Sequence, residues 1–101
     1  MSGGINTPLV PVGSQQLTVD STSGGVALTL PDGAHRAAMT LQTAQIRALD
    51  SGTAPTTTLG RVVEIGQQIN YLEYSSRVAL EKFRAIRTGA TSGVLDIVYY
   101  Q

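Results

Sequence analysis

Turn-forming residues interrupt this chain so often that most of its apolar segments are too short for ordinary helices. Residues 16–21 (QLTVDS) and 25–30 (GVALTL) alternate apolar and polar side chains, a pattern typical of half-buried strands. The sequence TSGG connects them, and PDG follows, in which Asp32 can cap the backbone and Gly33 can adopt a positive φ. The segment 16–30 is therefore predicted to form two strands that end in a turn.

Residues 34–50 are compatible with two structures. Their Ala, Leu, Met, Gln and Arg content favours a helix, with Met39 and Ile46 on one stripe. As strands, Met39 and Leu41 share a face while Ile46 and Ala48 have the opposite parity, so a bulge or tight turn is needed near residues 43–44. Periodicity alone leaves both structures open.

The second half of the chain is divided in the same way. A short helix or helical turn is predicted near 76–82, because a Ser precedes a stretch containing Glu and Lys. Four segments have strand-like sequences: RVVEI (61–65), QINYLEY (68–74), FRAIR (83–87) and GVLDIVYYQ (93–101). About seven short strands with turns roughly every ten residues predict an all-β, mainly antiparallel fold. The expected architecture is a single small β-sandwich or barrel over residues 16–101.

Residues 1–15 are predicted to form an extended N-terminal arm. Pro8, Pro11 and several glycines oppose regular structure, while Ile5, Leu9, Val10 and Val12 are more apolar than a typical disordered tail. Two interpretations stay open: an arm that becomes ordered against a neighbouring subunit, and a free terminus.

Charged residues are scarce, at 14% of the chain against about 25% in ordinary soluble domains. The cores of protein interfaces are depleted of charge, so this composition indicates a subunit packed against other subunits, as in a homo-oligomer. A polar domain of the extracellular type is an equally good interpretation of composition alone. Seven basic and seven acidic residues are scattered singly, without the basic stripe that nucleic-acid binding requires.

Targeting features are also missing from the sequence. No run of apolar residues is long enough to span a bilayer, and the first residues lack the basic and apolar regions of a signal peptide. Cysteine is absent, which excludes disulfides and thiolate chemistry. We therefore expect a chain made in a cytoplasm, without membrane association.

The residues that enzymes use are too sparse to indicate a catalytic site. His35 is the single histidine, and it follows a turn without a nucleophile elbow in the sequence. The carboxylates are spread singly, and the glycines do not have the spacing of a phosphate-binding loop. We expect no catalytic residues, no cofactor and no metal site.

The central sequence DSGTAPTTTLG (50–60) resembles a ligand loop at first sight. A structural turn explains it with fewer assumptions: Asp50 caps the backbone, Gly52 reverses it, Pro55 stiffens it, and the threonines return to extended structure before Gly60. We interpret this segment as a turn and not as a site.

Three stretches follow one another in the order VALTLPDGAHRAAMTLQTAQIRALDSGTAPTTTLG, VVEIGQQI and FRAIRTGATSGVLDIVYY. Over these stretches, about three quarters of the chain resembles a widespread type of small virion protein of tailed bacteriophages. DSGTAPT with the downstream Gly60 is the most specific part. The chain departs from the pattern in its longer NYLEYSSRVALEKF segment and in the lack of a Gly at residues 43–44.

The resemblance implies a β-rich, non-enzymatic structural component of the phage particle, and it favours strands at 36–42 and 45–49. We expect a head decoration (cementing) subunit that binds the major capsid protein and copies of itself in the virion. The alternative is a tail or fibre module that binds a host glycan through tyrosines, or another virion protein. Candidate contact residues are Ile5, Leu9, Val10, Val12, Tyr74 and Arg77.

Overall fold

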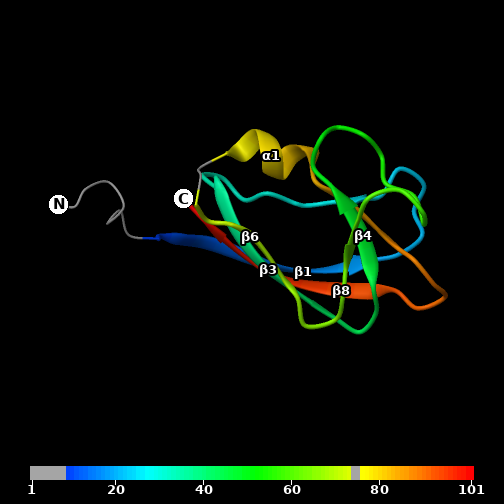
Figure 1. Cartoon of the computed structure of the whole chain (residues 1–101). Helices are drawn as coiled ribbons and strands as arrows, with labels where there is room; N and C mark the ends of the chain where they lie inside the picture. Colours follow the sequence, from blue (N-terminus) through cyan, green and yellow to red (C-terminus); the bar gives the residue numbers. More distant parts are fainter. Residues whose placement is uncertain (1–8, 74–75) are drawn as a thin grey trace.

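The chain folds into two antiparallel four-stranded sheets with one short helix (Figure 1). The computed structural model describes residues 9–73 and 76–101. The first sheet has the order β1 (Pro11–Val19), β8 (Gly93–Tyr100), β3 (Arg36–Gln42), β6 (Gln68–Tyr71). The second has the order β2 (Val26–Ala27), β7 (Arg84–Arg87), β4 (Ile46–Leu49), β5 (Arg61–Val63). The predicted all-β antiparallel fold is confirmed, and its two sheets make it sandwich-like.

The core lies between the two sheets and is built from alternate residues of each strand. In β8, for example, Leu95, Ile97 and Tyr99 are buried while Asp96 and Val98 are exposed. This alternation is what a strand with one solvated face requires. The other sheet and the helix complete the core with Ile46, Ala48, Val63, Leu80, Phe83 and Ala85.

The ambiguous segment 34–50 forms two strands, β3 and β4, which belong to different sheets. Between them Thr43 has a φ of 83°, and the Ala44 N–H donates to the Gln42 carbonyl oxygen at 3.1 Å. Such a tight turn is rare for a residue other than Gly. The turn reverses the odd–even pattern of the residues that face the core between β3 and β4, as the sequence requires. It also carries the chain from one sheet to the other without the expected glycine.

The first strand begins at Pro11, so the prediction that residues 11–15 belong to the arm was wrong. β1 is an edge strand, where a Pro without an N–H is tolerated, and its pairing with β8 shifts register between Pro11 and Gly13. The bulge lets Val12 pack against the core. Val12 is therefore part of the domain and not an arm contact.

Two other segments differ from expectation in length. The strand predicted at 25–30 pairs only at Val26–Ala27, because the Thr29 N–H is bound by the Gln15 side chain instead of a strand. The predicted helix is confirmed as α1 (Arg77–Lys82), whose N-cap residue Ser76 accepts a hydrogen bond from the Ala79 N–H.

Candidate functional site: a groove between two sheet edges

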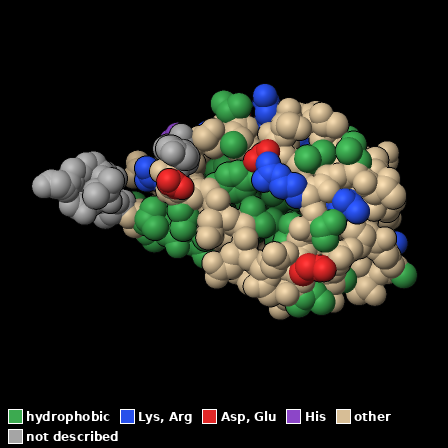
Figure 2. Space-filling view, viewed as in Figure 1, with side chains coloured by type: hydrophobic (Ala, Val, Ile, Leu, Met, Phe, Trp, Pro, Cys, Tyr) green, Lys and Arg blue, Asp and Glu red, His purple; other side chains and the backbone are tan. Residues whose placement is uncertain are grey.

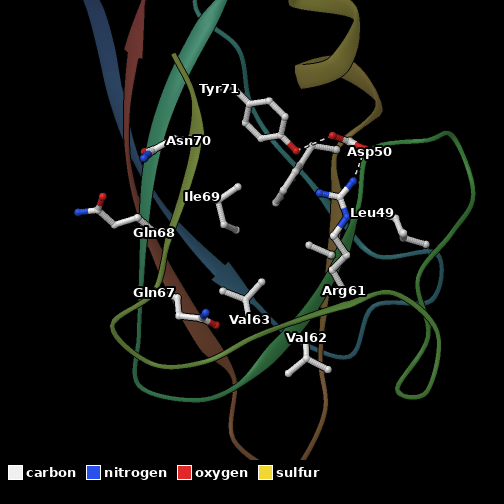
Figure 3. A pocket seen from close by; sticks show the side chains of 12 residues that line it. Leu49, Asp50, Arg61, Val62, Val63, Gln67, Gln68, Ile69, Asn70 and Tyr71 are labelled. Carbon is white, nitrogen blue, oxygen red and sulfur yellow. Dashed lines mark hydrogen bonds and ion pairs between the residues drawn. The ribbon is translucent and has the colours of Figure 1, made fainter. Parts of the chain in front are cut away.

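The sandwich is hollowed between β5 and β6, the edge strands of its two sheets (Figure 3). The groove has a volume of about 300 Å³. The strands β5 and β6 follow each other in the chain and are joined by the turn at residues 64–67, which closes one end of the groove. At the other end lie Asp50, Arg61 and Tyr71.

The floor of the groove is apolar and its rim is polar. Val63 and Phe83 are buried beneath it, and Ile69 is half-buried. Figure 2 shows this apolar floor as a hollow in the face of the molecule, with acidic and basic side chains beside it. On the β6 side, Ile69 and Tyr71 point into the groove, whereas the Gln68 and Asn70 side chains point away from it, toward the solvent side of their sheet (Figure 3). Gln67 lies in the turn, where its Oε1 atom accepts a hydrogen bond from the Glu64 N–H. An apolar groove between two strand edges suits an extended peptide.

Asp50 fastens the two sheets together at one end of the groove. Its Oδ2 atom accepts a hydrogen bond of 2.7 Å from the Tyr71 hydroxyl, and its Oδ1 atom lies 3.5 Å from Nη2 of Arg61. The Arg61 side chain is 75% exposed, so its ion pair with Asp50 contributes little. The Tyr71 ring also makes an edge-to-face contact with Phe83, with ring centroids 6.3 Å apart.

Burial raises the pKa of the Tyr71 phenol above its ordinary value, and the hydrogen bond to the Asp50 carboxylate raises it further. Tyr71 is therefore a hydrogen-bond donor to Asp50 throughout the physiological range. The interpretation of Asp50 as a backbone cap was wrong: its carboxylate joins Tyr71 and Arg61. Asp20 does act as such a cap: its carboxylate accepts hydrogen bonds from the Thr22 hydroxyl and from the Thr22 N–H, and these two bonds lower the pKa of Asp20.

Sequence reasoning missed this arrangement because its members are distant in the chain. Asp50 precedes Arg61 by eleven residues and Tyr71 by twenty-one. A partial signal existed in the two strand-like segments around Gly66, which predict two strands brought close by a turn. The identity of the aspartate partner depends on how the sheets pack, which the sequence alone does not give.

The rest of the 50–60 segment is a structural turn, as predicted. Gly52 has a φ of 94° and Gly60 a φ of 127°, while Pro55 is fully buried. Arg47 anchors the segment through two hydrogen bonds. Its Nε donates to the Thr57 carbonyl oxygen, and its Nη1 donates to the Gly60 carbonyl oxygen. The threonines do not return to extended structure. Instead the Thr56 hydroxyl accepts from the Thr58 and Leu59 N–H groups and closes a second turn.

The PDG turn is confirmed, and it explains the position of Arg77. Gly33 has a φ of 80°, the Ala34 N–H donates to the Pro31 carbonyl oxygen, and Asp32 is exposed between them. Arg77 donates to the carbonyl oxygens of Pro31 and Ala34, each at 3.0 Å. This guanidinium therefore ties the helix to the turn inside the domain, which makes it a poor candidate for a contact with a partner.

The other predicted contact residues lie at the N-terminal end of the chain or outside the described part. Leu9 and Val10 are 43% and 44% exposed, just before β1. The carbonyl oxygen of Val10 accepts from the N–H of Gln101, so the two ends of the chain lie together. Ile5 and Tyr74 fall outside the described residues.

A second surface lies on the solvent side of the sheet β1-β8-β3-β6, and we call it the outer face. Its side chains form cross-strand rows in which Asp96 lies between Gln16 and Thr40, and Val98 between Ser14 and Ala38. Gln16 and Gln42 donate hydrogen bonds to the two Asp96 carboxylate oxygens at 3.0 and 2.6 Å. The Asp96 carboxylate at the centre of this face is thus bound by neutral amides. A shallow depression lies over this part of the face.

Two negative findings concern the described residues 9–73 and 76–101. They contain no group of three His, Cys, Asp or Glu side chains placed to hold a metal ion. None of their helices is long and apolar enough to cross a membrane.

Comparisons of the chain with protein-family models, curated proteins and solved structures gave no match.

Proposed function

We propose that this protein is a non-enzymatic structural subunit of a tailed-bacteriophage particle, a decoration subunit that binds the major capsid protein on the head. Two lines of reasoning support the proposal. The sequence resembles small phage virion proteins, and the fold offers a broad sheet surface suited to packing against another protein.

The observation that carries the proposal is the lack of exposed charge on the outer face. Its side chains are Thr, Ser, Gln, Asn, Ala, Val and Tyr, with Arg36 at one end and Asp96 in the middle. Arg36 donates to the Gln101 carbonyl oxygen, and Asp96 is bound by two glutamines. A face with so little free charge has a small desolvation cost when a partner covers it.

One exposed apolar residue, Val98, also lies on the outer face. Val98 is 38% exposed at the centre of the outer face, next to the small side chain of Ala38. Small residues beside Val98 leave only a shallow depression, so a partner surface can approach closely. A shallow, neutral surface of this kind favours many modest contacts over one deep pocket.

The proposal is tested by binding the full-length chain to emptied heads of the phage that encodes it. Ala38→Glu and Val98→Glu each place a carboxylate in the middle of the outer face, and they should abolish retention on heads. The matched control is Thr53→Glu, which adds the same charge at an exposed position of the 50–60 turn. Circular dichroism of each variant shows whether the fold is kept.

Retention of a folded Val98→Glu variant at the wild-type level would overturn the proposal. The alternative, a tail or fibre module that binds a host glycan, predicts a different result. In that case a few copies would co-purify with tails, and a glycan array would show binding that depends on Tyr71.

A further inference from the structure

We propose that two copies of this chain associate through β1, with their β1 strands paired antiparallel about a two-fold axis. The two copies of the sheet β1-β8-β3-β6 then join into one continuous sheet. The inference goes beyond the proposed function, because it concerns an edge of the sandwich and not the outer face. It does not depend on what the outer face binds.

β1 is the longest of the four edge strands. Within residues 9–73 and 76–101 it pairs with β8 alone, although it has nine residues, so one side of its backbone has no strand partner. The other edge strands, β2, β5 and β6, have two, three and four residues. A short edge offers few backbone groups for pairing, whereas a long open edge invites a further strand. β1 is therefore the edge at which a further strand gains the most hydrogen bonds.

The protection of this edge is confined to its N-terminal end. Edge strands are commonly protected from pairing by charged side chains, prolines or bulges. Pro11 has no N–H to donate, and the register of β1 shifts between Pro11 and Gly13. From Ser14 to Val19 the strand has no proline, no register shift and no charged residue. Any pairing with β1 is therefore centred on residues 14–19.

The neighbouring segment 28–31 does not pair with this edge. It passes β1 on the core side, where the Oε1 atom of Gln15 accepts hydrogen bonds from the Tyr99 hydroxyl and from the Thr29 N–H. Among the described residues, no backbone hydrogen bond joins segment 28–31 to β1. The edge is therefore open within the described part of the chain.

The exposed side chains of this stretch fit a second copy of themselves. In a two-fold interface the same patch is contributed by both copies, so it must be complementary to itself. Ser14, Gln16 and Thr18 carry hydroxyl and amide groups, which both donate and accept hydrogen bonds. A carboxylate cannot bond to its own copy in this way, and like charges placed opposite each other destabilise a sheet. The partner that this edge fits is therefore the chain itself.

The register of the contact follows from the same stretch. Opposite residues of an antiparallel pair point to the same face, so an exposed residue has to meet an exposed residue. Gln16 opposite Gln16 of the second copy, with Ser14 opposite Thr18, meets this condition and keeps the pairs within β1. A centre closer to the bulge shortens the pairing, and a centre at Leu17 brings Asp20, beyond the end of β1, opposite Ser14.

Cysteine cross-linking of the full-length chain tests both the contact and its register, since the sequence has no cysteine. Opposite residues of an antiparallel pair have Cα atoms about 4.5–5.5 Å apart, which a disulfide can span. Gln16→Cys should therefore form a disulfide-linked dimer on oxidation. A mixture of Ser14→Cys chains and Thr18→Cys chains should form one as well.

Three controls make the cross-link specific. Ser14→Cys alone and Thr18→Cys alone should each give at most about a tenth of the dimer of their mixture, because each residue then lies about 13 Å from its own copy. Thr40→Cys is the matched control on the same face, an exposed residue two strands away from β1. Its two copies lie about 24 Å apart in the proposed dimer, so it should give equally little.

Charge substitution measures the contact without cysteines. Sedimentation of the wild-type chain should show a dimer of twice the chain mass. Ser14→Asp with Thr18→Asp places carboxylates opposite each other and should raise the dissociation constant at least about tenfold. Ser14→Lys with Thr18→Lys should do the same. A mixture of the two variants should restore the dimer, because each carboxylate then meets an ammonium group. Circular dichroism shows whether each variant keeps the fold.

Three outcomes would overturn the inference: no dimer from Gln16→Cys and none from the mixed chains, an equal yield from Thr40→Cys, or a wild-type chain that sediments as a monomer. Retention on heads is measured separately on cysteine-free chains. A dimer that heads do not retain would refute the proposed function and leave the inference standing. A monomer that heads do retain would refute the inference alone.

Discussion

The Tyr71 hydroxyl donates a hydrogen bond of 2.7 Å to the Asp50 carboxylate, and this bond joins β6 of one sheet to the segment that follows β4 of the other. It closes the groove at one end, where the Tyr71 ring also meets the Phe83 ring. The bond fixes the distance between β6 and the segment after β4 at this end of the groove.

Tyr71→Phe removes this hydrogen bond and keeps the ring. We expect it to lower the free energy of unfolding by about 1–2 kcal/mol, since a bond to a carboxylate in a half-buried place is lost. Arg61→Ala should cost less, about 0.5 kcal/mol, because the Arg61 side chain is largely exposed. Urea unfolding of both variants checks the order, and equal losses would contradict it.

At Gly93, the first residue of β8, the two sheets lie close together. A Cβ atom there would lie 2.6 Å from Cγ2 of Ile46 and 2.7 Å from the Ala44 carbonyl oxygen. Gly93→Ala should therefore lower the free energy of unfolding by about 1–3 kcal/mol through overpacking. Gly89→Ala is the control, because no atom lies within 4 Å of its Cβ position, and it should be close to neutral.

Arg47 is expected to order the 50–60 segment through two carbonyl oxygens at once. Arg47→Lys cannot make both bonds, since an ammonium group lacks the planar fork of a guanidinium. Hydrogen exchange in residues 56–60 should become faster, while stability falls by about 1 kcal/mol. Unchanged exchange in this variant would show that buried Pro55 alone holds the segment.

Stability should fall at alkaline pH. Burial raises the pKa of Tyr99 to about 12, and burial with the Asp50 bond raises that of Tyr71, whereas both titrate near 10 when unfolded. Between about pH 10 and 12 the unfolded chain has lost these protons and the folded chain keeps them, so the free energy of unfolding decreases with pH. Below about pH 10 this contribution is fully present.

Tyr99→Phe removes one of the two groups. Gln15, which accepts a hydrogen bond from the Tyr99 hydroxyl in the wild type, is unchanged in this variant. The decline of stability with rising pH should become shallower than in the wild type. Urea midpoints at about pH 9 and about pH 11 measure the slope. The same slope in both proteins would contradict the assignment.

Much of the fold could be predicted because local pattern and burial agree. The alternation of GVLDIVYYQ places Leu95, Ile97 and Tyr99 inside and Asp96 and Val98 outside, as found in β8. The segment 25–30 shows the limit of this reasoning. Leu28 and Leu30 do pack against the core, but the alternation does not reveal that the backbone beyond Ala27 leaves the sheet.

The groove could not be predicted for a different reason. Asp50 occurs in a sequence typical of a capped turn, and nothing near it in the chain indicates Tyr71 as its partner. The start of β1 was hidden in the same way, because Pro11 and Gly13 oppose a strand locally and only an edge position with a bulge accommodates them. Both features depend on which strands become edges, and tertiary packing decides that.

The most direct test of the central claim is a cryo-EM map of the phage particle that carries this chain. The account predicts many copies on the head lattice, each with the outer face of β1-β8-β3-β6 against the major capsid protein and Val98 at the centre of the contact. Density for a few copies on the tail, or heads bound through the 50–60 turn with Val98 facing solvent, would contradict it.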